Sequence, residues 1–149
     1  MKLHTKVTNL THDEIVTIFA DNYGSHWATF AYDMNDYYGT PLEDDDDCLE
    51  DKLAKILLGG GRIYINDHYA EDGVEVYGSL PHAYDEEEEY MQYSLRLEDI
   101  EAGLAKALDD MGCGITAIYN FLHDDRINFD INDADTLLQH ITFGEVIYG

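Results

Sequence analysis

Basic residues are scarce in this chain of 149 residues, which carries 8 Lys and Arg against 32 Asp and Glu and so has a net charge of −24 at pH 7. A surface of this sign repels the phosphates of a nucleic acid and the anionic lipids of a membrane. We therefore expect no direct binding to either. Like charges also repel one another across a folded chain, so the acidic residues must be compensated or used.

Cysteine and long apolar runs are scarce as well. Cys48 and Cys113 are the only cysteines and form no C-x-x-C pair, which argues against a zinc site and a disulfide framework. The N-terminal residues lack the apolar stretch of a signal peptide, and no run approaches the roughly 18 apolar residues of a membrane-spanning helix. We expect a soluble, cytoplasmic protein, and the length and the 45% hydrophobic content predict one domain over residues 1–149.

Periodic apolar residues predict five helices. They cover residues 12–21, 48–57, 98–111, 115–122 and 132–144. The first follows Thr11 and Glu14, whose spacing is that of a capping box. The second stops at three consecutive glycines, which favour a left-handed helix end. The last has three candidate caps, Asp130, Asn132 and Asp133.

Alternating and β-branched stretches predict strands. "RIYINDH" from Arg62 and "VEVYGSL" from Val74 resemble the two strands of a hairpin, and residues 90–97 alternate apolar and polar side chains. The segment Trp27–Tyr32 fits either a strand or one face of a helix. We therefore expect an α+β fold, in which a small, mostly antiparallel sheet of about 3–4 strands packs with about 4–5 helices.

Motifs for catalysis and for metal binding are missing from the sequence. "DMNDYYGTPLED" from Asp33 places its glycine one position late for a calcium loop, and the seven histidines form no H-x-x-x-H or H-E-x-x-H pair. There is no G-x-S-x-G, and "GGGR" at Gly59–Arg62 leads from a predicted helix into a strand, the reverse of a phosphate loop. We expect a protein that is not an enzyme and binds neither a cofactor nor a metal. A metal-dependent hydrolase is the least favoured alternative.

Acidic residues gather in two runs, "EDDDDCLEDK" at Glu43–Lys52 and "DEEEEY" at Asp85–Tyr90. The first lies at the start of the second predicted helix, where the helix dipole favours carboxylates, and the second lies in the connection to the strand predicted at residues 90–97. Tyrosines such as Tyr84 and Tyr90 stand among the acids and would add rigid contact area. The candidate partner-binding residues are Glu43, Asp44, Asp45, Asp46, Asp47, Glu50, Asp51, Asp85, Glu86, Glu87, Glu88 and Glu89.

The total charge is large enough to imitate a DNA duplex. At one charge per ~1.7 Å of duplex, the acidic excess would occupy roughly 41 Å, which is close to the ~38 Å diameter expected for a compact chain of this length. If the charge were gathered on one side, it would match a duplex of about 12 base pairs.

In size and composition the chain resembles the acidic DNA-mimic inhibitors that phages and mobile elements use against restriction enzymes and CRISPR effectors. The stretches "EDKLAKILLGGG" and "DADTLLQHITFGEVIYG" also resemble small acidic proteins found on mobile elements of gut bacteria. The resemblance implies a non-enzymatic inhibitor that occupies the cleft of a basic nucleic-acid-binding host defence protein.

Two other readings of the charge stay open. The protein would also fit an acidic accessory or scaffold role, in which the charge serves solubility or adaptation to high salt. The sequence leaves a homodimer open, and its symmetry would join two acidic faces into a longer one.

Overall fold

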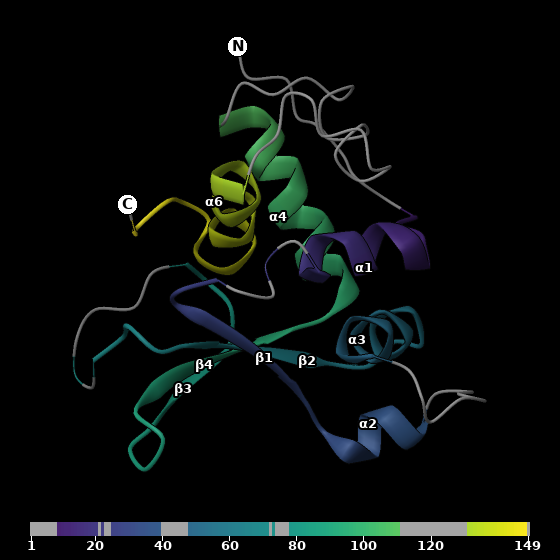
Figure 1. The fold of residues 1–149 in the computed structure, drawn as a ribbon, viewed down its shortest axis with the longest axis horizontal. Coiled ribbons are helices and arrows are strands. Elements are labelled where there is room, and N and C mark those ends of the chain that lie inside the picture. Colours follow the sequence, from purple (N-terminus) through teal and green to yellow (C-terminus); the bar gives the residue numbers. More distant parts are fainter. Residues whose placement is uncertain are drawn as a thin grey trace.

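The structure is a computed structural model that describes residues 9–20, 22, 25–39, 48–71, 73, 78–110 and 131–148. Within these residues the chain forms five helices and one four-stranded antiparallel sheet (Figure 1). The predicted α+β class is therefore confirmed. The expected helix around residues 115–122 and the acidic residues 43–47 lie outside the described residues.

Two N-terminal helices follow the sequence pattern closely. Helix α1 covers His12–Ala20 and begins with the predicted capping box. The backbone N–H of Thr11 donates to Oε1 of Glu14 at 2.9 Å, and the N–H of Glu14 donates to Oγ1 of Thr11 at 3.2 Å. Helix α3 covers Leu49–Leu58 and ends before Gly60, which has a left-handed φ of 87°. Both helices bury the apolar faces that their periodicity predicts, Ile15, Ile18 and Phe19 in α1 and Leu53, Ile56 and Leu57 in α3.

The sheet has the strand order β1-β2-β4-β3. The strands are β1 (Ala28–Tyr32), β2 (Ile63–Asp67), β3 (His82–Asp85) and β4 (Tyr90–Leu95). The ambiguous segment at Trp27–Tyr32 is thus a strand from Ala28. Strand β4 buries Met91, Tyr93 and Leu95 in alternation, as its sequence predicts.

The predicted hairpin between "RIYINDH" and "VEVYGSL" is wrong. Over its whole length β2 pairs with β1 on one side and with β4 on the other, so no edge of β2 is left for a partner that begins at Val74. Residues 74–77 lie outside the described residues, and residues 78–80 form bends instead of a strand. The actual hairpin joins β3 to β4 through the second acidic run.

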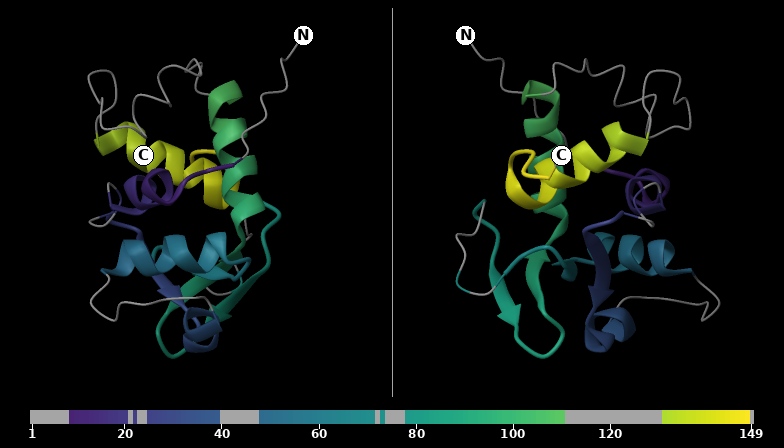
Figure 2. Two further views of the ribbon diagram at one scale, coloured as in Figure 1. Left: turned by 90° about the vertical axis from the view of Figure 1, so that its right-hand side faces the viewer. Right: turned by 60° about the vertical axis from the view of Figure 1, so that its left-hand side comes forward.

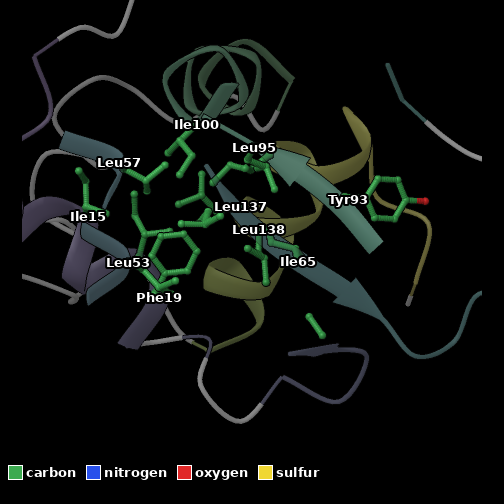
Figure 3. Packing of buried hydrophobic residues seen from close by; sticks show 14 of the residues in the cluster. Ile15, Phe19, Leu53, Leu57, Ile65, Tyr93, Leu95, Ile100, Leu137 and Leu138 are labelled. Atoms are coloured by element: carbon green, nitrogen blue, oxygen red, sulfur yellow. The ribbon is translucent and has the colours of Figure 1, made fainter. Parts of the chain in front are cut away.

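Four helices, α1, α3, α4 (Leu97–Asp110) and α6 (Ile131–Phe143), enclose the core with the sheet. Figure 1 and Figure 2 show α1, α4 and α6 on one side of the sheet, while the β3–β4 turn extends away from them. Figure 3 shows side chains of both helices and strands meeting in this core, among them Phe19, Leu53, Ile65, Leu95, Leu137 and Leu138. The short helix α2 (Met34–Gly39) follows β1.

Helices α4 and α6 cross closely because α4 has a glycine at the contact. A Cβ atom added to Gly103 would lie 2.5 Å from the Cα atom of Ile141, well inside van der Waals contact. Among the helices in the described part of the chain, none is both long enough and apolar enough to cross a membrane.

Candidate functional site

The second acidic run forms the turn of the β3–β4 hairpin, and its first acid holds the turn together. Oδ1 of Asp85 accepts hydrogen bonds from the backbone N–H groups of Glu87 and Glu88, both at 3.0 Å. The carbonyl of Asp85 accepts a third from the N–H of Glu89 at 2.8 Å. Glu89 has a left-handed φ of 59°, which closes the turn into β4. Asp85 is therefore a structural residue of the hairpin as well as a member of the acidic run.

The four glutamates of this turn, Glu86–Glu89, are exposed. In the part of the chain that the structure describes, none of their carboxylates forms a hydrogen bond or an ion pair. Consecutive Cα atoms are about 3.8 Å apart, so four negative charges are carried by a backbone segment of at most roughly 11 Å. We call this segment, Glu86–Glu89, the acidic turn.

A shallow groove of about 390 Å³ lies beside the acidic turn. Its lining consists of Ala83, Tyr84, Asp85, Glu86, Glu87, Tyr90 and Gln92. Burial raises the pKa of the Tyr90 phenol, and the nearby carboxylates of Asp85 and Glu88 raise it further. The Tyr90 hydroxyl therefore stays protonated at neutral pH, and it keeps its capacity to donate a hydrogen bond.

The ring of Tyr90 is supported from the neighbouring strands. It makes an edge contact with the ring of His68 at a centroid distance of 5.2 Å. Nε2 of His68 in turn lies 2.7 Å from Oγ1 of Thr29 on β1. These contacts link β4 to β1 through His68, the residue that follows β2, so Tyr90 is placed by the fold and not by the turn alone.

The described end of the first acidic run is arranged differently. Glu50 and Asp51 lie in the first turn of α3, as predicted. Oδ1 of Asp51 lies 2.9 Å from Nε2 of His12 on α1, and Oδ2 accepts a hydrogen bond from the thiol of Cys48 at 2.9 Å. The Cys48 hydrogen bond and the His12 hydrogen bond lower the pKa of Asp51. Asp51 therefore ties α1 to the start of α3, a role that local sequence patterns do not indicate.

The same contact makes Cys48 a poor nucleophile. The hydrogen bonds to Asp51 and then to Glu50 raise the pKa of the Cys48 thiol to about 11. A reactive cysteine needs the opposite shift, because the thiolate is the nucleophile. Although Cys48, Asp51 and His12 lie close together, the carboxylate stands between the thiol and the imidazole, so His12 is not placed as a base for the thiol.

The two acidic runs do not form one patch through their described residues. Figure 1 shows α3 and the β3–β4 turn on opposite sides of the view, and both views of Figure 2 also separate them. Glu50 and Asp51 are therefore not neighbours of the acidic turn. Of the predicted partner-binding residues that the structure describes, only Asp85 and Glu86–Glu89 share one site.

A buried polar network that sequence patterns did not predict lies at the C-terminal end of β2. The hydroxyl of Tyr148 donates to Oδ2 of Asp67 at 2.6 Å, and Oε1 of Gln139 accepts the backbone N–H groups of Ile147 and Tyr148, both at 2.9 Å. Oδ1 of Asp135 accepts hydrogen bonds from Nε1 of Trp27 and from Oγ of Ser25, both at 2.7 Å. This network fixes the C-terminal segment to the core, and its one sequence signal is an acid, Asp67, at the end of an apolar strand.

Within the described residues, no group of three His, Cys, Asp or Glu side chains is placed to hold a metal ion. Comparison with known proteins finds no matching family, no similar curated protein and no similar solved structure. The candidate site is therefore defined by its own chemistry: four exposed carboxylates without partners in the described chain, held on an ordered hairpin beside a groove with two tyrosines.

Proposed function

We propose that this protein is a non-enzymatic DNA mimic, which uses the acidic turn to bind the basic cleft of a nucleic-acid-binding protein and thereby inhibits it. The observation that carries the proposal is the acidic turn itself. Four consecutive glutamates lack a partner within the described residues, although the chain has a net charge of −24 that already disfavours such a cluster.

An ordered hairpin suits this role better than a flexible acidic tail. A tail loses conformational entropy when it binds, whereas three hydrogen bonds to Asp85 already fix the turn. A basic cleft that binds phosphates offers clustered Lys and Arg side chains, and these pair with carboxylates as they do with phosphates. The net charge of the whole chain would speed the encounter through long-range attraction.

Because the two acidic runs lie apart, the proposed contact surface includes only one of them. Asp51 is engaged by His12 and Cys48, and α3 lies away from the acidic turn, so we propose the β3–β4 hairpin as the principal contact. The groove beside it would then receive part of the partner, with Tyr84 and Tyr90 supplying contact area. We propose that the partner is a host defence protein, a restriction enzyme or a CRISPR effector, and that a phage or mobile element encodes the inhibitor.

The experiment compares two variants with equal loss of charge. In the turn variant, Glu86, Glu87, Glu88 and Glu89 are all changed to Gln. In the control variant, four exposed acids elsewhere, Asp13, Glu71, Glu98 and Glu145, are changed to Asn or Gln. Each protein is titrated against DNA binding and cleavage by a panel of purified restriction enzymes and CRISPR effectors.

We expect the wild type to compete with DNA for at least one member of the panel, and the inhibition to weaken as salt rises. The turn variant should inhibit at least about 10-fold less, whereas the control variant should inhibit like the wild type. Equal inhibition by the wild type and the turn variant would rule out mimicry through the hairpin. An equal loss in both variants would instead support the reading in which only bulk charge matters.

A further inference from the structure

We propose that the groove beside the acidic turn binds an arginine side chain of the partner, with the guanidinium group stacked on the ring of Tyr90 and paired with the carboxylates of Glu86 and Glu87. This inference rests on the proposed function and adds the type of residue that the partner presents. The volume of the groove, the charge of its lining and two side chains that the sheet holds in place favour arginine over lysine.

The groove suits a cation on a long side chain better than a bare ion. Its volume of about 390 Å³ is more than ten times the roughly 30 Å³ that one water molecule occupies in the liquid. Of its described lining residues, three are acids and none is Lys, Arg or His. Oδ1 of Asp85 accepts hydrogen bonds of the turn, whereas the carboxylates of Glu86 and Glu87 have no partner within the described residues. A positively charged side chain is therefore attracted to this lining.

Tyr90 supplies an aromatic wall whose position is fixed before a partner binds. The ring is half-buried and makes the edge contact with His68, whose Nε2 lies 2.7 Å from Oγ1 of Thr29. A ring that is already held loses little conformational entropy when a ligand stacks on it. A guanidinium plane stacks on aromatic rings, and the cation gains electrostatic attraction from the ring.

Gln92 supplies a fixed hydrogen-bond acceptor in the same lining. Its Nε2 donates to Oδ1 of Asn66 at 3.1 Å, and Asn66 is only 6% exposed. This orientation leaves Oε1 of Gln92 as an acceptor, and it has no hydrogen-bond partner within the described residues. Tyr90 and Gln92 are two positions apart on β4, so their side chains lie on the same face of the sheet. The groove thus offers an aromatic ring and an amide oxygen next to carboxylates.

This combination distinguishes arginine from lysine. A guanidinium group has five N–H donors in one plane, so its edges can pair with carboxylates and with Oε1 of Gln92 while its face lies on Tyr90. The ammonium of lysine is a compact, strongly hydrated charge with three donors, and it would gain mainly the attraction to the carboxylates. Clefts that bind nucleic acid use arginine for phosphates and for base edges, so the proposed class of partner can present this side chain.

The experiment measures whether the protein prefers arginine to lysine. Two peptides of equal charge with blocked ends, Gly-Arg-Gly-Arg-Gly and Gly-Lys-Gly-Lys-Gly, are titrated into isotope-labelled protein at physiological salt while amide chemical shifts are recorded. The arginine peptide should bind at least about 3-fold more tightly, because stacking on Tyr90 adds to the attraction between charges. Its largest shifts should fall on the amides of Ala83, Tyr90 and Gln92.

Two substitutions at Tyr90 test the ring itself. Tyr90→Phe keeps the ring and should keep the preference for the arginine peptide. Tyr90→Val suits a strand but removes the ring, so it should bind both peptides equally. Both variants retain the acidic turn and should bind the lysine peptide like the wild type. Unchanged amide shifts away from the groove show that each variant is folded.

Equal binding of the two peptides by the wild type, binding of neither peptide, or an arginine preference that survives in Tyr90→Val would overturn the inference. DNA mimicry is decided separately, because it requires only the clustered carboxylates and is tested by the Glu86–Glu89 variant in competition with DNA. A protein that does not compete with DNA but prefers the arginine peptide would refute the proposed function and leave the groove as an arginine site.

Discussion

The hydroxyl group of Tyr148 donates a 2.6 Å hydrogen bond to Oδ2 of Asp67, and this contact joins the C-terminal segment to the end of β2. Asp67 is only 1% exposed, and burial raises its pKa, while the hydrogen bonds from Tyr148 and from the backbone of Tyr69 and Ala70 lower it. The ring of Tyr148 also packs against Trp27 at a centroid distance of 5.7 Å. One side chain thus satisfies a buried carboxyl group and completes an aromatic cluster.

The first prediction concerns this hydrogen bond. Tyr148→Phe should lower the free energy of unfolding by about 1.5–3 kcal/mol at pH 7, because a buried carboxyl group loses its donor. The change also raises the folded-state pKa of Asp67 further, and a raised carboxyl pKa costs stability as the pH rises through it. The loss should therefore be larger at pH 7 than near pH 4.

Urea unfolding followed by the fluorescence of Trp27, the single tryptophan, measures this loss. Tyr69→Phe is the control, because the Tyr69 side chain is 51% exposed and should contribute less than about 0.5 kcal/mol. If both variants unfold at the same urea concentration, the Tyr148–Asp67 hydrogen bond contributes nothing to stability.

Sequence patterns predicted correctly the features that depend on residues close together in the chain. The capping box at Thr11 and Glu14 and the alternation of Met91, Tyr93 and Leu95 were both confirmed, because caps and burial alternation depend on nearby residues. The partner of β2 was not predicted, since strand pairing is decided by the whole sheet. Strand β3 was missed for a different reason: it has four residues, and its sequence, "HAYD", shows no apolar alternation.

The candidate site was predicted in part. The sequence placed "DEEEEY" in the connection before β4, but it did not indicate that Asp85 would cap the turn or that a groove would lie beside Tyr90. Asp51 looked like one more surface acid, yet its partner His12 comes from a different helix. In both cases the missing information is a tertiary contact, which charge patterns along the chain do not encode.

The second prediction concerns the reactivity of Cys48. Its pKa of about 11, against an ordinary 9.0, lowers the thiolate fraction at pH 8 about 100-fold. In a Cys113→Ser background, Cys48 should react slowly with iodoacetamide, and Asp51→Asn should speed the reaction about 10-fold or more by weakening the hydrogen bond. Mass spectrometry at timed intervals measures the rate. Glu98→Gln removes an equal charge elsewhere, and an equal rate in both variants would contradict the role of Asp51.

The third prediction tests the crossing of α4 and α6. In a solvent-exposed helix, Gly103→Ala would raise the free energy of unfolding by about 1 kcal/mol, because alanine has the higher helix propensity. Here the new Cβ atom would lie 2.5 Å from the Cα atom of Ile141, and a backbone atom does not move aside as a side chain does. We therefore expect Gly103→Ala to lower the free energy of unfolding by about 1–3 kcal/mol, as measured by thermal unfolding. The control is Ala102→Ser, one residue earlier and exposed, which should lower the free energy of unfolding by less than about 0.5 kcal/mol. If Gly103→Ala instead stabilises the protein, the two helices separate easily at this contact.

The fourth prediction concerns the effect of the acidic turn on the thermal stability of the fold. Four like charges on adjacent residues repel one another and the rest of a chain with a net charge of −24. Changing Glu86–Glu89 to Gln keeps the hydrogen bonds to Asp85 and should raise the midpoint of thermal unfolding by about 2–4 °C at low salt. At 1 M salt the Debye length falls to about 3 Å, so the gain should disappear.

Scanning calorimetry at both salt concentrations measures this gain, with the variant of Asp13, Glu71, Glu98 and Glu145 as the control of equal charge. If the midpoint of thermal unfolding rises more in the turn variant than in the control, charge repulsion is stronger at the acidic turn than at exposed acids elsewhere. The turn would then destabilise the fold while serving binding, which is the relation expected of a functional site. If the midpoint of the turn variant does not rise at low salt, the clustered charge does not destabilise the fold, and solubility becomes a sufficient explanation for the acidic turn.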